Sequence, residues 1–258
     1  MNSFRVLVGK ELREAWHTKR LPMVALLFIV LGLMSPLAAR YLPEILRAAL
    51  GDQLPVPIPA PVAADAVAQV QKNIGQMGAL AAIALTMGAV AGEVDRGTAA
   101  LVLAQPVARW VFLAAKLVAI AVVLGVSTFA AVGVAWVYAA LLFEPMSIGG
   151  WLSLALLDWL ALCAWASLTF LASAATGSAT ASAGLGFVAW IGVSIVAVIP
   201  QLDRLLPTGL GEPAYRLASS LTEGMDAGRL ATAVAGTAVL IAAAGIGSMV
   251  SFSRRELR

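Results

Sequence analysis

The chain has 258 residues, of which 61% are hydrophobic and only 12% are charged, and its formal net charge is +3. Its mean hydropathy of +0.92 excludes a soluble globular domain, because the polar residues are too few to cover such a domain in water. The small positive charge does not indicate nucleic-acid binding, since the basic residues are distributed along the chain and do not form one basic surface.

The first twenty residues carry both signs of charge and predict an amphipathic helix that lies in the membrane interface. Phe4 and Trp16 belong to a series of apolar residues that recur every four positions, which places them on one face of a helix. Glu11 falls in the middle of this apolar face, where a carboxylate needs a partner. We therefore expect Glu11 to face protein and to pair with a basic group of a neighbouring cytoplasmic segment. The chain is then expected to turn into the membrane at Pro22.

Six apolar runs follow, at residues 21–39, 74–92, 111–142, 151–173, 184–200 and 229–252. Most are near the ~20 residues that cross the hydrocarbon core as a helix, and they lack the alternation of a membrane β-barrel. The first run is too long for a typical signal-peptide core, so it is predicted to be a retained span. The sequence thus predicts an all-α membrane protein with six transmembrane helices in one transmembrane domain, residues 1–258.

Lysine and arginine residues predict the orientation, because they are held on the cytoplasmic side of a membrane. With the N-terminus inside, the cytoplasmic segments hold 11 of these residues and the outside segments hold 6. Both termini are therefore expected in the cytoplasm, and the chain in the cytoplasmic membrane as a multi-pass protein. A single cysteine, Cys163, provides neither a disulfide framework nor a multi-cysteine metal site.

The segment at residues 93–110, between the second and third runs, combines charges with turn signals. Glu93 and Asp95 end one helix, and Gly97 permits a turn. Thr98 is suited to cap a short helix over residues 99–104, which Pro106 would end. We expect a short cytoplasmic helix that stands apart from the membrane spans.

This short helix would have an apolar side with charged flanks. Leu101 and Leu103 would be too exposed in a free loop, and Arg96 lies just before the helix. Such a helix is suited to docking into a groove of another protein. The alternative is an ordinary charged loop between two spans, anchored at the interface by Arg109 and Trp110.

Asp158 is the only acidic residue placed well inside a predicted span, ~10 Å into the fourth run at 1.5 Å per residue. An intramembrane carboxylate is costly, so it is a candidate for lining a translocation path, where it would bind a cationic group or a proton. The alternative is a structural carboxylate that is bonded to a neighbouring Ser, Thr or Trp N–H or reached by outside water.

The chain as a whole resembles the ABC-2 family of ABC transporter permeases. The resemblance covers essentially all residues and depends on the order of several weak patterns. These are six spans with both ends inside, the leader Gly-Lys-Glu-Leu-Arg-Glu at residues 9–14, the pattern Glu93-x-x-x-Gly97-Thr98 followed by Pro106-x-x-Arg109 and Lys116, and the tail Phe252-x-Arg254-Arg255-Glu256-Leu257.

This resemblance implies that residues 93–110 form a coupling segment that docks into a separate ATP-binding subunit. It further implies two ATP-binding subunits and a second permease copy, in a homodimer or a related heterodimer within the lipid bilayer. The resemblance also implies export, and the Ala, Leu, Val, Phe and Trp residues expected to line the cavity suit amphipathic or hydrophobic cargo. The residues implied in docking are Glu93, Asp95, Arg96, Gly97, Thr98, Leu101, Pro106 and Arg109.

No lysine in this chain is followed by Ser or Thr, so the sequence contains no Walker A phosphate loop. We expect a chain that is not itself an enzyme and binds no cofactor, with ATP and Mg²⁺ on the partner subunit. Two alternatives stay open: an ion-coupled secondary carrier that uses Asp158, and an ABC-associated membrane subunit that transmits motion without transporting. An intramembrane enzyme is disfavoured, because the sole histidine, His17, lies in the leader.

Overall fold

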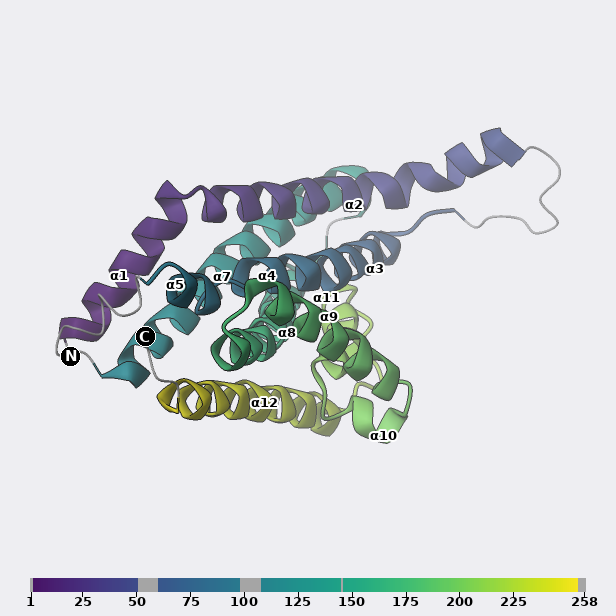
Figure 1. The fold of residues 1–258 in the computed structure, drawn as a ribbon. Helices are drawn as coiled ribbons and strands as arrows, with labels where there is room; N and C mark the ends of the chain where they lie inside the picture. The colour runs from purple at the N-terminus through teal and green to yellow at the C-terminus, as the bar shows by residue number, and fades with distance from the viewer. Residues whose placement is uncertain (1, 51–59, 98–107, 145, 255–258) are drawn as a thin grey trace.

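A computed structural model describes residues 2–50, 60–97, 108–144 and 146–254, and within them it contains helices and no strand (Figure 1). Six helices are long and apolar enough to cross a membrane, which confirms the predicted all-α class with six candidate spans. They are Arg20–Ile45, Ala63–Asp95, Arg109–Leu142, Ile148–Thr176, Ala179–Val196 and Ala227–Ser253.

The chain turns between α1 (Asn2–His17) and α2 (Arg20–Leu50). The turn is made by Thr18 and by Lys19, which has a φ of 58°, and not by Pro22 as the sequence suggested. Pro22 lies in the first turn of α2, where its missing N–H would have no helical partner in any case. Two further prolines, Pro36 and Pro43, lie inside α2.

The second span is a composite of four helices: α3 (Ala63–Asn73), the π-helix η2 (Ile74–Gly78), α4 (Ala79–Thr86) and α5 (Ala91–Asp95). It begins eleven residues before the predicted start at residue 74, and α2 extends to Leu50. Much of the segment between the first two predicted runs, residues 40–73, is therefore helical. The reason is packing: α3 contacts α2 and α11 and buries Ala66, Val67 and Val70.

The third, fourth and fifth spans are α7 (Arg109–Leu142), α8 (Ile148–Thr176) and α9 (Ala179–Val196). A tight turn joins α8 to α9: Gly177 has a φ of 65°, and the Ser178 side chain accepts a hydrogen bond from the amide of Ala181. The fifth span therefore begins and ends earlier than the predicted run at residues 184–200. Pro200 instead begins the short helix α10 (Pro200–Asp203).

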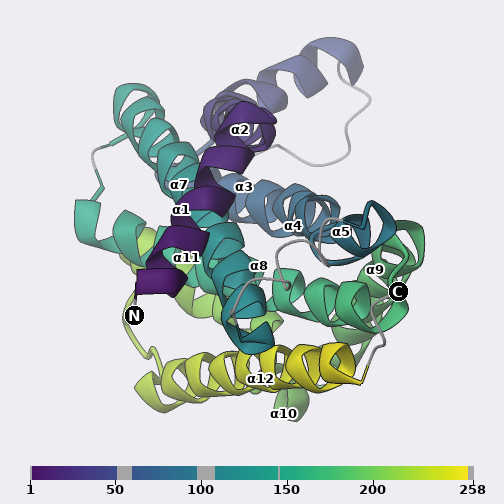
Figure 2. The same cartoon turned by 60° about the vertical axis from the view of Figure 1, so that its left-hand side comes forward.

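The remaining elements are η3 (Pro207–Leu210), α11 (Gly211–Ala218) and α12 (Ala227–Ser253). Helix α8 lies at the centre of the bundle and contacts α4, α7, α9, α11 and α12, as Figure 2 shows. Helix α2 packs closely on α7 at Gly32. The backbones are so near there that a Cβ atom on Gly32 would overlap the carbonyl oxygen of Ala131. Such small residues allow two membrane helices to approach each other.

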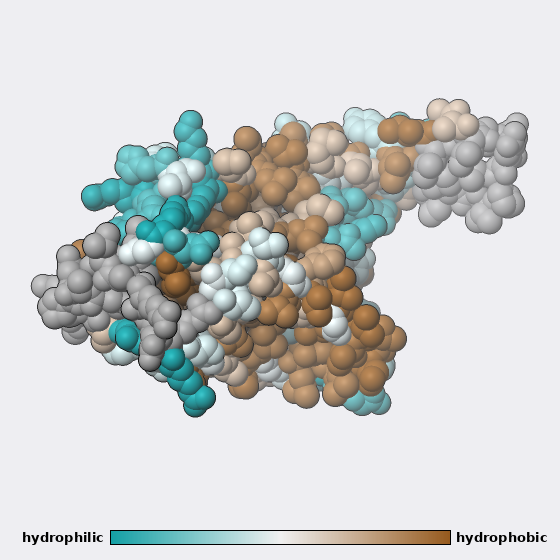
Figure 3. All heavy atoms as spheres, in the orientation of Figure 1, coloured by the Kyte–Doolittle hydropathy of each residue, from teal (hydrophilic) through white to brown (hydrophobic). Residues whose placement is uncertain are grey.

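Many large apolar side chains lie on the outside of the bundle, including Leu26 and Val30 of α2, Val188 and Ile195 of α9, and Val239 of α12. In Figure 3, hydrophilic residues gather over α1, and a broad hydrophobic surface lies beyond it. An apolar surface of this extent is suited to contact with lipid or with a partner in the membrane.

Candidate functional site

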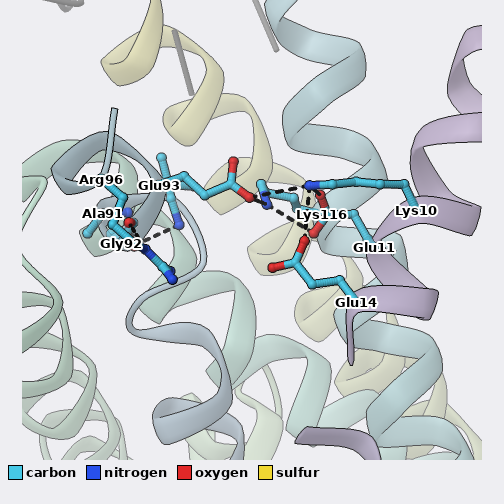
Figure 4. A network of polar contacts seen from close by, with 10 residues as sticks. Lys10, Glu11, Glu14, Ala91, Gly92, Glu93, Arg96 and Lys116 are labelled. Carbon is cyan, nitrogen blue, oxygen red and sulfur yellow. Dashed lines mark hydrogen bonds and ion pairs between the residues drawn. The ribbon is translucent and has the colours of Figure 1, made fainter. Parts of the chain in front are cut away.

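Five charged side chains from three helices meet at the α1 end of the bundle (Figure 4). We call them the Lys116 cluster: Lys10, Glu11 and Glu14 of α1, Glu93 of α5, and Lys116 of α7. The Lys116 Nζ atom lies 2.6 Å from Glu93 Oε1 and 2.9 Å from Glu11 Oε2. The Lys10 Nζ atom lies 3.0 Å from Glu11 Oε1, 3.1 Å from Glu14 Oε2 and 3.6 Å from Glu93 Oε1. Two ammonium groups thus link three carboxylates.

The centre of the Lys116 cluster is buried. The side chain of Lys116 is 4% exposed, those of Glu93 and Glu11 are 9% and 13% exposed, and that of Lys10 is 42% exposed. Removing ions from water costs several kcal/mol each, on the order of what close pairing returns, so buried charges persist only with good geometry. The short contacts of Lys116 therefore hold α1, α5 and α7 together.

The outer members of the cluster have shifted pKa values. Burial alone would lower the pKa of Lys10, but hydrogen bonds to Glu11 and Glu14 and the charges of Glu11 and Glu93 raise it above its ordinary value. Burial alone would raise the pKa of Glu14, but the hydrogen bond and charge of Lys10 lower it. Both groups are therefore held in their charged forms across the physiological pH range.

Carboxylate oxygens of Glu11, Glu14 and Glu93 lie within 4.8 Å of one another, close enough to share a metal ion. The ammonium groups of Lys10 and Lys116 already contact these oxygens at 2.6–3.6 Å. They supply the positive charge that a cation would otherwise bring. The arrangement fits an ion-pair network and not a metal site.

The structure gives Glu11 the basic partner that the sequence argument required, namely Lys116. The same side of α1 packs against α7, and its apolar neighbours Leu7 and Leu12 are partly buried. Phe4 is also partly buried, whereas Trp16 is 60% exposed. The apolar side of α1 is thus shared between protein and the surrounding medium.

Ser173 of α8 holds the break between α4 and α5. Its hydroxyl group donates to the carbonyl oxygen of Met87 at 2.9 Å and accepts from the amides of Ala91 at 3.0 Å and Val90 at 3.3 Å. Backbone groups released by a helix break inside a membrane protein need such partners. Ser173 therefore fixes the start of α5, the helix that carries Glu93.

The cluster also connects to the last span through aromatic side chains. The Lys116 Nζ atom lies 5.1 Å from the ring centre of Phe112, and this ring stacks on Phe252 of α12 at 6.1 Å between centres. At the start of α7, the Arg109 guanidinium group donates to the carbonyl oxygen of Ser253 at 3.1 Å. The ends of α7 and α12 are therefore joined beside the cluster.

The predicted docking residues differ in where they lie. Asp95 and Arg96 are exposed, and Gly97 has a φ of 68°, a conformation that favours glycine, where α5 ends. The Arg96 Nε–H group donates to the carbonyl oxygen of Gly92 at 2.8 Å. Glu93 is buried and directed at Lys116. Thr98, Leu101, Pro106 and the predicted helix at residues 99–104 lie outside the described residues.

Asp158 lies within the buried face of α8 and is 7% exposed. Within the described residues its Oδ2 atom has no hydrogen-bond partner. The neighbouring Trp159 donates its indole N–H to the carbonyl oxygen of Ala121 at 2.8 Å and not to this carboxyl group. In the part of the chain that the structure describes, no Ser, Thr or Trp side chain therefore donates a hydrogen bond to Oδ2.

Comparison with known proteins identifies the family. The model of the "ABC-2 family transporter protein" matches residues 5–257. The chain belongs to the ABC-2 family. It is also similar to YxlG of Bacillus subtilis (strain 168), an uncharacterized transmembrane protein, with 28% identity over 212 residues that cover 81% of this chain and 80% of the relative.

In this ABC-2 family protein, the sequence argument did not find three contributors to the site: Lys10, Glu14 and Ser173. One signal was present for the first two, since Lys10 and Glu14 are four residues apart on a helix. No sequence signal pointed to Ser173, because a serine near the end of an apolar helix is common and its role depends on the neighbouring helix break.

Proposed function

We propose that this chain is the membrane-spanning permease subunit of an ATP-driven exporter, with the α1 end of the bundle in the cytoplasm of a cell whose cytoplasmic membrane it crosses. Its partners are two ATP-binding subunits and a second permease copy. The excess of lysine and arginine in the segments at this end supports the orientation. ATP, Mg²⁺ and hydrolysis are assigned to the partner subunit, because no lysine here precedes Ser or Thr.

The observation that carries the proposal is the attachment of α5 to the rest of the bundle. Glu93 contacts Lys116 of α7, which also contacts Glu11 of α1, and Ser173 of α8 holds the start of α5. Charge-assisted hydrogen bonds are short and strong, so a displacement of α5 is transmitted to these helices. The exposed residues Asp95 and Arg96 follow directly. This is the arrangement that a segment receiving motion from an ATP-binding subunit requires.

In this mechanism, ATP binding closes the two ATP-binding subunits around nucleotide, and residues 93–110 follow that closure. Nucleotide binds the closed form more tightly than the open form, and this difference shifts the population between two states of the path. The path is lined by residues of the bundle and takes amphipathic or hydrophobic cargo. We place Asp158 on it, because a buried carboxyl group with an unbonded oxygen is suited to a cationic group or a proton of the cargo.

The test is co-expression and co-purification of this chain with an ABC ATP-binding subunit of the same organism, followed by ATPase and transport assays in lipid vesicles. The variant Asp95→Ala/Arg96→Ala removes two exposed charges at the end of α5. Its matched control, Arg204→Ala/Glu223→Ala, removes one basic and one acidic residue, both exposed and both in the segment between α9 and α12. We expect the first variant to weaken the complex or uncouple ATP hydrolysis from transport, and the control to behave as wild type.

Two outcomes would redirect the proposal. A wild-type chain that purifies alone and transports without nucleotide would favour an ion-coupled carrier that uses Asp158. A stable, nucleotide-hydrolysing complex that moves no cargo would favour a membrane subunit that transmits motion to another protein. If the two double variants formed the complex and coupled ATP hydrolysis equally well, Asp95 and Arg96 would not contribute to docking.

A further inference from the structure

An apolar cleft of about 540 Å³ opens between α2 and α4. It shares Arg20, Leu85 and Gly88 with a small pocket lined by the Lys116 cluster. Arg20 lies at one end, and the remaining lining is apolar: Met23, Val24, Leu27, Ala81, Ala84, Leu85, Met87 and Gly88. Its volume lies in the range of about 300–1,000 Å³ that is typical of pockets for small molecules. The cleft therefore has one cationic end and an apolar body.

The length of the cleft matches part of one membrane leaflet. From Arg20 to Leu27 the lining of α2 rises ~10 Å at 1.5 Å per residue. One leaflet contributes about half of the ~30 Å hydrocarbon core. A molecule with its charged group at Arg20 would thus extend an apolar chain along the cleft toward the middle of the bilayer.

The charges around the α1–α2 turn favour an anionic group. The three acids of the Lys116 cluster, Glu11, Glu14 and Glu93, are engaged by Lys116 and Lys10, which leaves the cluster with a formal charge of −1. Arg13, Lys19 and Arg20 are exposed and make no ion pair with the described part of the chain, although the charge of Arg20 contributes to the lowered pKa of Glu14. These three cations outweigh the charge of the cluster. In Figure 3 the hydrophilic surface over α1 borders the hydrophobic surface of α2. The net field at the mouth of the cleft is therefore positive.

We propose that this cleft binds an anionic phospholipid from the leaflet on the α1 side, with its phosphate at Arg20 and one acyl chain between α2 and α4. Exposed cations next to an apolar surface attract anionic lipid headgroups. A second copy of the chain is disfavoured as the occupant, since a two-fold contact through this face would bring the cations at its mouth close to those of the partner. The inference requires membrane embedding but no ATP-binding subunit.

The test uses the purified full chain in vesicles of phosphatidylcholine that contain spin-labelled phosphatidylglycerol or spin-labelled phosphatidylcholine. Electron paramagnetic resonance then gives the immobilised fraction of each labelled lipid. Wild type should immobilise phosphatidylglycerol preferentially. Arg20→Gln should reduce this preference about fivefold, the effect of about one surface cation. Arg5→Gln is the matched control, because Arg5 is exposed on α1 and does not line the cleft.

A second variant tests the apolar body of the cleft. Ala84→Phe fills the space that the acyl chain would occupy, and Val239→Phe places the same ring on the exposed surface of α12. Ala84→Phe should lower the immobilised phosphatidylglycerol fraction, and Val239→Phe should not. Three results would overturn the proposal: equal effects of Arg20→Gln and Arg5→Gln, an unchanged fraction in Ala84→Phe, or an Ala84→Phe variant that changes only the oligomeric state.

Discussion

Replacing Lys116 by methionine keeps the length of the side chain but removes the ammonium group at the centre of the Lys116 cluster. The cluster's formal charge then falls from −1 to −2, and Glu93 and Glu11 lose contacts of 2.6 Å and 2.9 Å. Breaking a buried ion pair by deleting one partner costs about 3–5 kcal/mol. Lys10 remains 3.0 Å from Glu11 and 3.6 Å from Glu93, so we expect a loss near the lower limit, about 3 kcal/mol.

The free energy of unfolding is best measured by titrating the detergent-purified protein with sodium dodecyl sulfate. The double variant Lys116→Met/Glu93→Gln removes the uncompensated carboxylate as well, and it should recover about 2 kcal/mol of the loss, because directly contacting residues couple by about 0.5–3 kcal/mol. Lys72→Met is the matched control. Lys72 is exposed and forms no ion pair within the described residues, so its replacement should change stability by less than about 0.5 kcal/mol.

The reasoning would be refuted by a Lys116→Met protein that unfolds like the Lys72→Met protein. It would also be refuted by a double variant that is no more stable than Lys116→Met alone. Either result would mean that the cluster does not hold α1 and α5 on α7, and the proposed transmission path would lose its central contact.

Four further predictions concern Glu14 of the same cluster and three residues elsewhere in the chain. Because the folded-state pKa of Glu14 is lowered, its stabilising contribution is complete above its ordinary pKa and is lost as the pH falls through the lowered value. On acidification, the melting temperature of Glu14→Gln should therefore fall less steeply than that of wild type. Ser173→Ala should cost about 1–3 kcal/mol by leaving backbone groups at the helix break without partners, and hydrogen exchange of the α5 amides should accelerate. Gly32→Ala should cost about 1–3 kcal/mol because its Cβ would overlap the backbone of α7, whereas Gly133→Ala, with open space around it, should be neutral or stabilising in the same unfolding assay. Asp158→Asn should leave the free energy of unfolding unchanged or higher while abolishing transport in vesicles; retained transport at normal expression would place this residue off the path.

The fold class could be predicted from the sequence because hydropathy is a property of continuous segments. Six apolar runs gave six helices, and no tertiary information was needed. The ends of the helices were harder to predict, since they depend on contacts. Helix α3 begins at Ala63 because its apolar residues are covered by α2 and α11, two segments that are distant in sequence. The turn before α2 lies at Lys19 because proline is tolerated in the first turn of a helix.

The candidate site could be predicted only in part, for a related reason. Glu11 was conspicuous as a charge on an apolar helix face, and the need for a basic partner followed from electrostatics alone. Its partner Lys116 could not be selected among the basic residues, since that choice depends on how α1 lies along α7. Glu93 was expected to face a docking partner, yet its carboxylate is directed at Lys116, so the exposed charges at the end of α5 are those of Asp95 and Arg96.

The charges of the cluster supply what apolar packing between α1 and α7 does not, namely a single register. Apolar contacts are non-directional, so α1 could slide along α7 by one turn, ~5.4 Å, at little cost in buried area. That slide would replace Glu11 beside Lys116 by Leu7 or Ala15 and would leave a buried ammonium group with one carboxylate fewer. The penalty of several kcal/mol for an unpaired buried ion opposes the shift. The cluster therefore fixes α1 to one position relative to α5, which is the condition for the two to move together.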